Sequence, residues 1–142
     1  MEKHIKRLAV LTMGLCLLTC PGCGKKSTKP RCSHTIVGQW SWVESYGGFA
    51  GERLTPESEG YTKKQVFGRD STFLEYRNDS LIFNAKYSIS RKPVWNSDTA
   101  LVLEISGFHD QIIGFAGKDT LELTEHCLDC FEHRFCRILH KD

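Results

Sequence analysis

The sequence predicts an all-β domain, an eight-stranded antiparallel up-and-down barrel, over residues 36–142. From residue 36 onward, apolar and polar residues alternate with a period of two, and turn-forming residues interrupt the alternation. Strand-like segments recur about every 8–12 residues, as in all-β barrels and sandwiches. We expect eight strands, at 36–46, 61–69, 71–77, 81–90, 99–106, 110–116, 119–124 and 130–139.

The alternation is clearest in the fourth and the last of these segments. One face of the fourth segment carries Leu81, Phe83, Ala85, Tyr87 and Ile89. One face of the last segment carries Phe131, His133, Phe135 and Arg137. Because successive side chains of a strand point to opposite faces, we expect both sets to face the interior of the domain.

The short connections between the segments favour hairpins, and therefore antiparallel neighbours. Pairing the first strand with the last closes eight strands into a barrel and removes both sheet edges. A two-sheet sandwich is the alternative, because the same patterns build it with longer crossovers. The longest connection, 47–60, is rich in glycine and would lie at the mouth of the barrel, where we consider a lid or partner-binding role.

The N-terminal segment has the pattern of a secretory signal. Residues 1–7 carry three basic side chains and one acidic one, and residues 8–19 are apolar or neutral. The run then ends in Leu-Leu-Thr-Cys-Pro-Gly-Cys, which resembles a bacterial lipoprotein signal with its acylated cysteine. We expect residues 1–22 to form the signal peptide and Cys23 to carry the lipid, palmitate included, with Cys20 as the alternative site.

Charge and hydropathy limit the partners of the chain. Residues 23–35 predict a flexible basic tether, whose lysines either favour an anionic lipid surface or belong to a solvated linker without lipid preference. The whole chain has 19 basic and 17 acidic residues, which excludes a strongly basic nucleic-acid binder. No apolar run reaches the roughly 18 residues that a membrane-spanning helix needs. We therefore expect attachment to the bacterial envelope, and to its outer membrane, through the lipid alone.

Two motifs at the ends of residues 36–142 resemble a known family. Gly38-Gln39-Trp40 opens the first expected strand, and Cys130–Arg137 closes the last. The body resembles a small bacterial lipocalin-like lipoprotein of the wider lipocalin (calycin) group. That resemblance implies that an arginine of the last strand packs on the Trp40 indole and closes the barrel base. Strand parity favours Arg137 for this role over Arg134, and no helix is expected after the last strand.

The expected barrel places the cysteines in two groups, one at its base and one at its mouth. Cys32 precedes the first strand and Cys136 lies near the end of the last, so both would be near the base. Cys127 and Cys130 flank a turn at the mouth, about 8 residues or roughly 27 Å away along the strand. A disulfide needs Cα atoms within about 7 Å. We predict the disulfides Cys32–Cys136 and Cys127–Cys130 in an oxidising compartment.

The Cys-x-x-Cys segment has two other interpretations. Its cysteines and the nearby histidines suit zinc by residue type: His126, Cys127, Cys130 and His133. A redox-active pair is the second, although no thioredoxin-like pattern of strands and helices surrounds it. We expect no metal ion and no cofactor.

The aromatic interior suggests a function. Candidates to line a ligand site are Trp42, Phe83, Tyr87, Phe131, His133 and Phe135. The sequence has no nucleophile elbow, HExxH or phosphate-binding glycine loop, so we expect no enzyme. We expect a lipid-anchored envelope protein whose barrel binds a small apolar ligand. The alternative is a structural, interaction or inhibitor-type lipoprotein with a filled barrel.

Overall fold

The computed structural model describes residues 34–95 and 99–139. The predicted signal peptide, both candidate lipid-attachment cysteines, most of the tether and Cys32 lie outside the described residues. Within the described part of the chain, no helix combines the length and the apolar character needed to cross a membrane.

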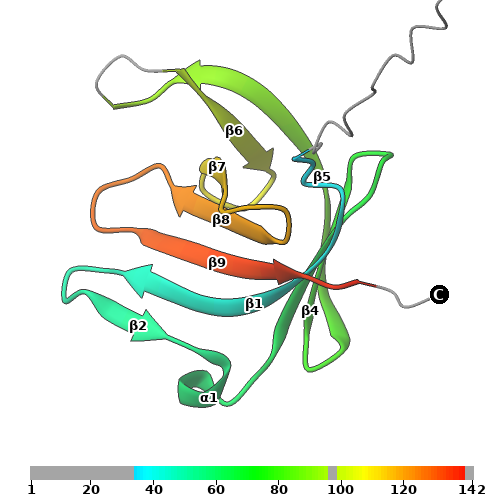
Figure 1. Ribbon diagram of the computed structural model, residues 1–142, viewed down its shortest axis with the longest axis vertical. Coiled ribbons are helices and arrows are strands. Elements are labelled where there is room, and N and C mark those ends of the chain that lie inside the picture. The colour runs from blue at the N-terminus through cyan, green and yellow to red at the C-terminus, as the bar shows by residue number, and fades with distance from the viewer. Residues whose placement is uncertain (1–33, 96–98, 140–142) are drawn as a thin grey trace, which may run out of the picture. The chain divides into compact units, whose positions relative to one another are not determined.

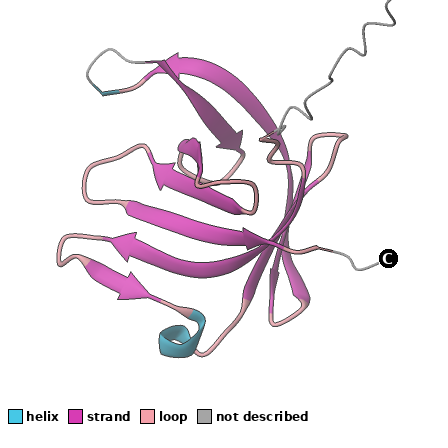
Figure 2. Ribbon diagram, viewed as in Figure 1, coloured by secondary structure: helices cyan, strands magenta, loops and turns pink. Residues whose placement is uncertain are grey.

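The described residues form an antiparallel sheet and one short helix (Figures 1 and 2). Its strands are β1 (Gly38–Gly47), β2 (Glu52–Leu54), β3 (Lys63–Phe67), β4 (Thr72–Arg77), β5 (Ser80–Pro93), β6 (Thr99–Ile105), β7 (Gln111–Phe115), β8 (Thr120–Glu125) and β9 (Phe131–Arg137). The helix α1 (Pro56–Glu59) follows β2. Each of the eight predicted segments overlaps one of these strands, and β1, β5 and β8 extend past the predicted bounds.

Pairing of β1 with β9 closes the sheet into a barrel. The two strands are in register from Trp40 opposite Arg137 to Gly47 opposite Phe131. The other edge of β1 pairs with β3 in its first half and with β2 in its second half. The result is a closed eight-stranded antiparallel barrel with β2 as an extra strand. This confirms the predicted barrel and excludes the two-sheet sandwich.

The segment between β1 and β3, predicted as a loop, contains β2 and α1. Thr55 caps α1 through a hydrogen bond from the Ser58 amide to its side chain, and Ser58 reaches back to the Thr55 amide. Pro56 starts the helix, and Gly60 ends it with a left-handed φ of 72°. The Thr-Pro-x-Ser sequence is a helix start signal, which the loop prediction overlooked.

The apolar core fills the barrel around Trp40. Its buried members are Ile36, Trp40, Trp42, Phe67, Phe73, Leu103, Ile105, Leu121, Leu123 and Phe135. They come from strands on all sides of the barrel and alternate with outward residues, as the period of two predicts.

The prediction of which β5 side chains face the interior is confirmed in the middle of the strand and wrong at its ends. Phe83, Ala85 and Tyr87 pack against the core, whereas Leu81 and Ile89 are exposed. A bulge between β4 and β5 shifts the register, so that Leu81 lies opposite the outward residue Tyr76.

The last part of β5 changes partner. β5 pairs with β4 up to Lys86 and with β6 from Tyr87 onward, and it curves between these two neighbours (Figure 1). Its continuation brings the Trp95 ring to 4.6 Å from the His126 ring. The β5–β6 connection, expected at the base, therefore meets the turn between β8 and β9.

Candidate functional site

Apart from Gln111, which is also buried, six polar residues of the described chain gather in the barrel interior beside the apolar core. This polar cluster consists of Ser45, Lys63, Gln65, Glu75, Glu125 and His133. All but Ser45 follow the parity of a core residue on their own strand, as Gln65 follows Phe67 and His133 follows Phe135. Hydrogen-bond contacts join Ser45 to His133 and His133 to Glu125, and Gln65 donates to Glu75 on the neighbouring strand.

A bulge in β1 turns Ser45 into the polar cluster. The register between β1 and β9 shifts between Trp42 and Glu44. Strict alternation from Trp42 would turn Glu44 inward, but the bulge places Ser45 in the interior instead. The sequence interpretation missed Ser45 because a bulge leaves no signal in the alternation.

A chain of hydrogen bonds runs through the cluster. Trp42 Nε1 donates to Ser45 Oγ at 2.9 Å, and Ser45 Oγ lies 2.6 Å from His133 Nδ1. His133 Nε2 lies 3.3 Å from a carboxylate oxygen of Glu125. A carboxylate only accepts, so His133 Nε2 carries the proton that it donates to Glu125. In the neutral imidazole, Nδ1 then accepts from the Ser45 hydroxyl, whose oxygen also accepts from the Trp42 indole.

Burial adjusts two protonation equilibria in this region. Burial lowers the pKa of His133, and the positive charge of Lys63 lowers it further, against the opposing effect of Glu125. Burial also lowers the pKa of Lys63, against the opposing charge of Glu75. Both effects favour the neutral forms of these bases inside the barrel.

The order Ser45–His133–Glu125 resembles a hydrolase triad in residue type but not in arrangement. In such a triad the serine oxygen is open to substrate and faces donors that stabilise an oxyanion. Here Ser45 is buried, and its oxygen is held between an indole N–H and the imidazole. We assign Ser45 a structural hydrogen-bonding role. The absence of enzymatic activity stays a prediction.

Gln65 carries a buried acceptor without a partner. Its Nε2 donates to Glu75 at 2.9 Å, while its Oε1 has no hydrogen-bond partner among the described residues. Flipping the amide would set Oε1 against the Glu75 carboxylate, so the orientation is fixed by Glu75. The residue is only 4% exposed. Such a buried group is normally satisfied by an ordered water or a bound molecule.

Cations and aromatic rings alternate beside the cluster. Lys63 Nζ lies 4.7 Å from the centroid of the Trp42 ring. Trp42 stacks on Tyr61 with ring centroids 5.8 Å apart, and the Arg77 guanidinium lies 4.1 Å from the Tyr61 ring centroid. Lys63 has no carboxylate within 4.0 Å in residues 34–95 and 99–139. Its charge is therefore balanced only by the ring and by more distant acids.

Three of the six predicted ligand-lining residues lie at the cluster. Trp42 and His133 belong to its hydrogen-bonded chain. Phe131 stacks on His133 with ring centroids 6.2 Å apart, and its amide donates to Glu125 at 3.3 Å. These side chains form one wall with both apolar and polar character.

The other three predicted residues belong to the apolar core or pack against it. Phe135 is fully buried in the core, and its ring centroid lies 6.5 Å from that of His133. Phe83 packs edge-on against Phe73, and Tyr87 donates its hydroxyl to the Gly68 carbonyl at 2.8 Å. The structure therefore does not gather all six around one site.

Arg137 joins the end of β9 to the start of β1. Its guanidinium carbon lies 4.1 Å from the Trp40 ring centroid. The same group donates to the carbonyls of Val37 at 3.1 Å and Thr35 at 2.8 Å. Arg134 instead lies on the outer face and pairs with Glu44. This is the arrangement that the family resemblance implies for Arg137 rather than Arg134.

The described cysteines lie at opposite ends of β9. Cys127 and Cys130 are at disulfide distance, with Cα atoms 5.6 Å apart, as predicted. Cys136 is exposed near the end of β9. Its predicted partner, Cys32, lies outside the described residues, so that disulfide stays a prediction.

The four residues of the zinc interpretation do not converge. Ligand atoms of Glu125, Cys127 and Cys130 lie within 4.8 Å of one another. However, the His126 ring packs against Trp95, and His133 bonds to Ser45 inside the barrel. The histidine ligands that this interpretation requires therefore have other partners.

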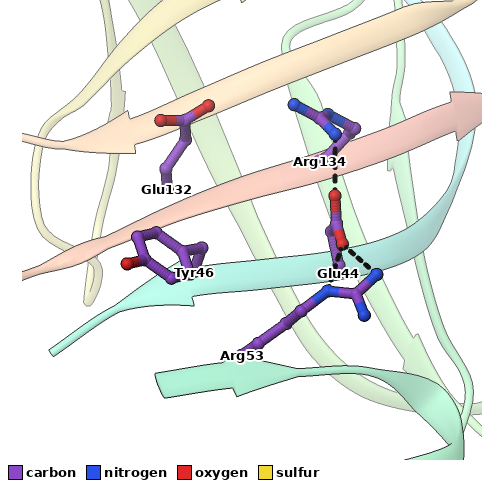
Figure 3. A pocket seen from close by; sticks show the side chains of 5 residues that line it. All are labelled: Glu44, Tyr46, Arg53, Glu132 and Arg134. Atoms are coloured by element: carbon purple, nitrogen blue, oxygen red, sulfur yellow. Dashed lines mark hydrogen bonds and ion pairs between the residues drawn. The ribbon is translucent and has the colours of Figure 1, made fainter. Parts of the chain in front are cut away.

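Two surface depressions lie over the described strands, and no residue of the polar cluster lines either of them. The first, of about 280 Å³, is lined by Glu44, Tyr46, Arg53, Glu132 and Arg134 (Figure 3). In it Glu44 pairs with Arg53 and Arg134, each at 2.7 Å. The second, of about 410 Å³, lies along β5, β6 and the connection to β7.

Comparisons of this chain with protein-family models, with curated proteins and with solved structures found no match. A functional assignment has to rest on the geometry of the barrel and on the pattern of the sequence.

Proposed function

We propose that this chain is a lipid-anchored protein of the bacterial envelope whose barrel binds a small, mostly apolar molecule by one polar group. The observation that carries the proposal is the unpartnered Oε1 of Gln65 in the barrel interior. An acceptor of this kind matches a ligand that offers one hydroxyl or N–H group.

The energetic cost of the polar cluster supports the same conclusion. Burying polar and charged groups is unfavourable unless each is fully paired, and apolar residues of similar size often serve a core better. A small barrel that keeps six polar side chains inside therefore gains something other than stability. Pockets that bind small molecules combine apolar walls with a few polar groups. Trp42 and Phe131 supply the wall, and Gln65 and Lys63 supply the polar groups.

The anchor rests on the sequence pattern of residues 1–23. Acyl chains on a cysteine would hold the protein at a membrane, because each buried CH₂ contributes about 0.8 kcal/mol. Cys23→Ser should release the protein into the soluble fraction of disrupted cells, whereas Cys20→Ser should leave it in the membrane fraction. The reverse result would move the anchor to Cys20, and membrane association of the double variant would exclude a lipid anchor.

Native mass spectrometry tests ligand binding even when the identity of the ligand is unknown. Full-length protein purified from its own membranes in mild detergent should show a discrete added mass that denaturation releases. Gln65→Leu should lower the occupancy at least tenfold, because it removes the acceptor. Leu139→Ala, at a position exposed outside the barrel, should keep it. Equal occupancy in both variants, or no added mass in the wild type, would contradict the proposal.

A filled barrel that acts through its outer surface is the second candidate. The apolar core favours it, because Trp40, Phe73 and Leu103 are completely buried and leave no exposed apolar floor. An absent added mass in the same experiment, with a folded protein, would favour this candidate.

A further inference from the structure

Two turns lie side by side at one end of the barrel. Residues 48–51 connect β1 to β2, and residues 126–130 connect β8 to β9. The turns are neighbours because the last residue of β1, Gly47, lies opposite the first residue of β9, Phe131 (Figure 1). We call these two turns the double tip.

Close packing locks the double tip. A Cβ atom on Gly47 would overlap the carbonyl oxygen of Cys130, and one on Gly48 would lie 3.3 Å from the Phe131 ring. Gly48 also has a left-handed φ of 72°. The second turn is braced by the pair Cys127–Cys130. Turns fixed in this way lose little conformational entropy when they bind a partner.

The double tip presents apolar side chains to solvent. Phe49 is 95% exposed and Leu128 is 88% exposed, each at the centre of its turn. Tyr46, which reaches the first turn, and Trp95, which contacts His126, are also exposed. Exposed apolar groups gathered in one place mark sites of interaction with another molecule.

The surroundings of these side chains are acidic. Glu52, Asp129 and Glu132 are exposed, and none of them forms an ion pair in the described part of the chain. The nearby cations Arg53 and Arg134 both pair with Glu44 (Figure 3), and Arg134 also pairs with Glu122, so these four side chains carry no net charge. The free charge around the double tip is therefore negative.

We propose that the double tip is a docking surface for a protein partner that offers an apolar pocket surrounded by lysine and arginine residues. Phe49 and Leu128 enter the pocket, and the free carboxylates face the basic rim. Charge complementarity excludes the two other occupants: an anionic lipid surface and a second acidic double tip would both be repelled. The substitutions that test this surface leave the polar cluster unchanged, so either assignment can fail alone.

Site-specific photo-crosslinking in the native cell tests this proposal. A benzophenone amino acid replaces Phe49 in the full-length chain, and a second variant carries it at Leu139, exposed beyond the opposite end of β9. The proposal expects one discrete protein adduct from position 49 and none of that mass from position 139. An adduct with phospholipid or with a second copy of the chain, or no adduct, would overturn it.

Binding measurements with the purified crosslinked protein complete the test. Phe49→Ala should weaken the affinity at least about tenfold, as at a central apolar anchor. The triple variant Glu52→Gln, Asp129→Asn and Glu132→Gln should also bind more weakly and depend less on salt than the wild type. Leu139→Ala should bind within about twofold of the wild type, the size of a neutral surface change. Equal losses in Phe49→Ala and Leu139→Ala, or wild-type binding that rises with salt, would contradict the proposal.

Discussion

The apolar core and the polar cluster occupy the same barrel and obey different rules. In the core, side chains such as Phe73, Leu121 and Phe135 contribute through burial and close packing, and a loss of volume is costly. In the cluster, Gln65 and Glu75 contribute only while each donor meets an acceptor, and one acceptor remains free.

This difference separates the requirements of folding from those of binding. A barrel of this size folds because of its core, and we expect its cluster to contribute less stability than an apolar filling would. Substitutions in the core and in the cluster should therefore change the free energy of unfolding by different amounts, and in one case in opposite directions.

The largest effect is expected in the core. Phe135→Ala leaves a cavity among fully buried side chains and should lower the free energy of unfolding by about 3–5 kcal/mol. Urea unfolding followed by fluorescence measures it, with exposed Leu139→Ala as a control that should change stability by less than about 0.5 kcal/mol. A similar cost for both variants would mean that this core is not packed as described.

In the cluster, a double substitution that removes both partners of a hydrogen bond should not lower the free energy of unfolding, unlike the loss of a core side chain. Glu75→Leu alone leaves the Gln65 amide without its acceptor and should cost about 1–3 kcal/mol. The double variant Gln65→Leu, Glu75→Leu removes both partners and should recover the wild-type free energy of unfolding or exceed it. The double-mutant cycle measures this coupling. A double variant less stable than Glu75→Leu would show that the cluster stabilises the fold.

His133 should make stability depend on pH. Because burial and Lys63 lower its pKa in the folded state, the unfolded chain, with a histidine pKa of about 6.5, binds the proton first as pH falls. Stability due to this group is therefore intact above that value and declines below it, by at most about 1.4 kcal/mol per pH unit. Unfolding of the wild type and His133→Gln between about pH 7 and pH 5.5 measures it. His133→Gln should lack this part of the pH dependence. Equal changes of the free energy of unfolding with pH in both proteins would contradict the prediction.

A small effect is also expected at the turn between β8 and β9. The pair Cys127–Cys130 closes a very short loop, so Cys127→Ser with Cys130→Ser should lower the free energy of unfolding by no more than about 2 kcal/mol. Thermal unfolding of the two proteins side by side shows this. A loss as large as that of Phe135→Ala would give the turn a role in holding the barrel closed.

The sequence predicted the strands well because burial imposes a period of two on most of them. Phe83, Ala85 and Tyr87 face the core as expected. The errors lie where the period breaks, since bulges turn Ser45 inward and Leu81 outward. No alternation pattern contains that information.

The polar cluster was only partly predictable. His133 was expected inside, and the parity of the segment from Tyr61 to Phe67 would also have placed Lys63 and Gln65 there. Their polar character argues against an interior position, so hydropathy alone does not identify them. The hydrogen bond between Gln65 and Glu75 depends on the register of β3 against β4, which sequence patterns do not specify.

A high-resolution crystal structure of full-length protein purified from its own membranes tests the central claim most directly. The account predicts electron density for a bound molecule, other than water, with a donor atom about 2.7–3.2 Å from Gln65 Oε1. Density for water alone at that atom, or a protein donor bonded to it, would contradict the account.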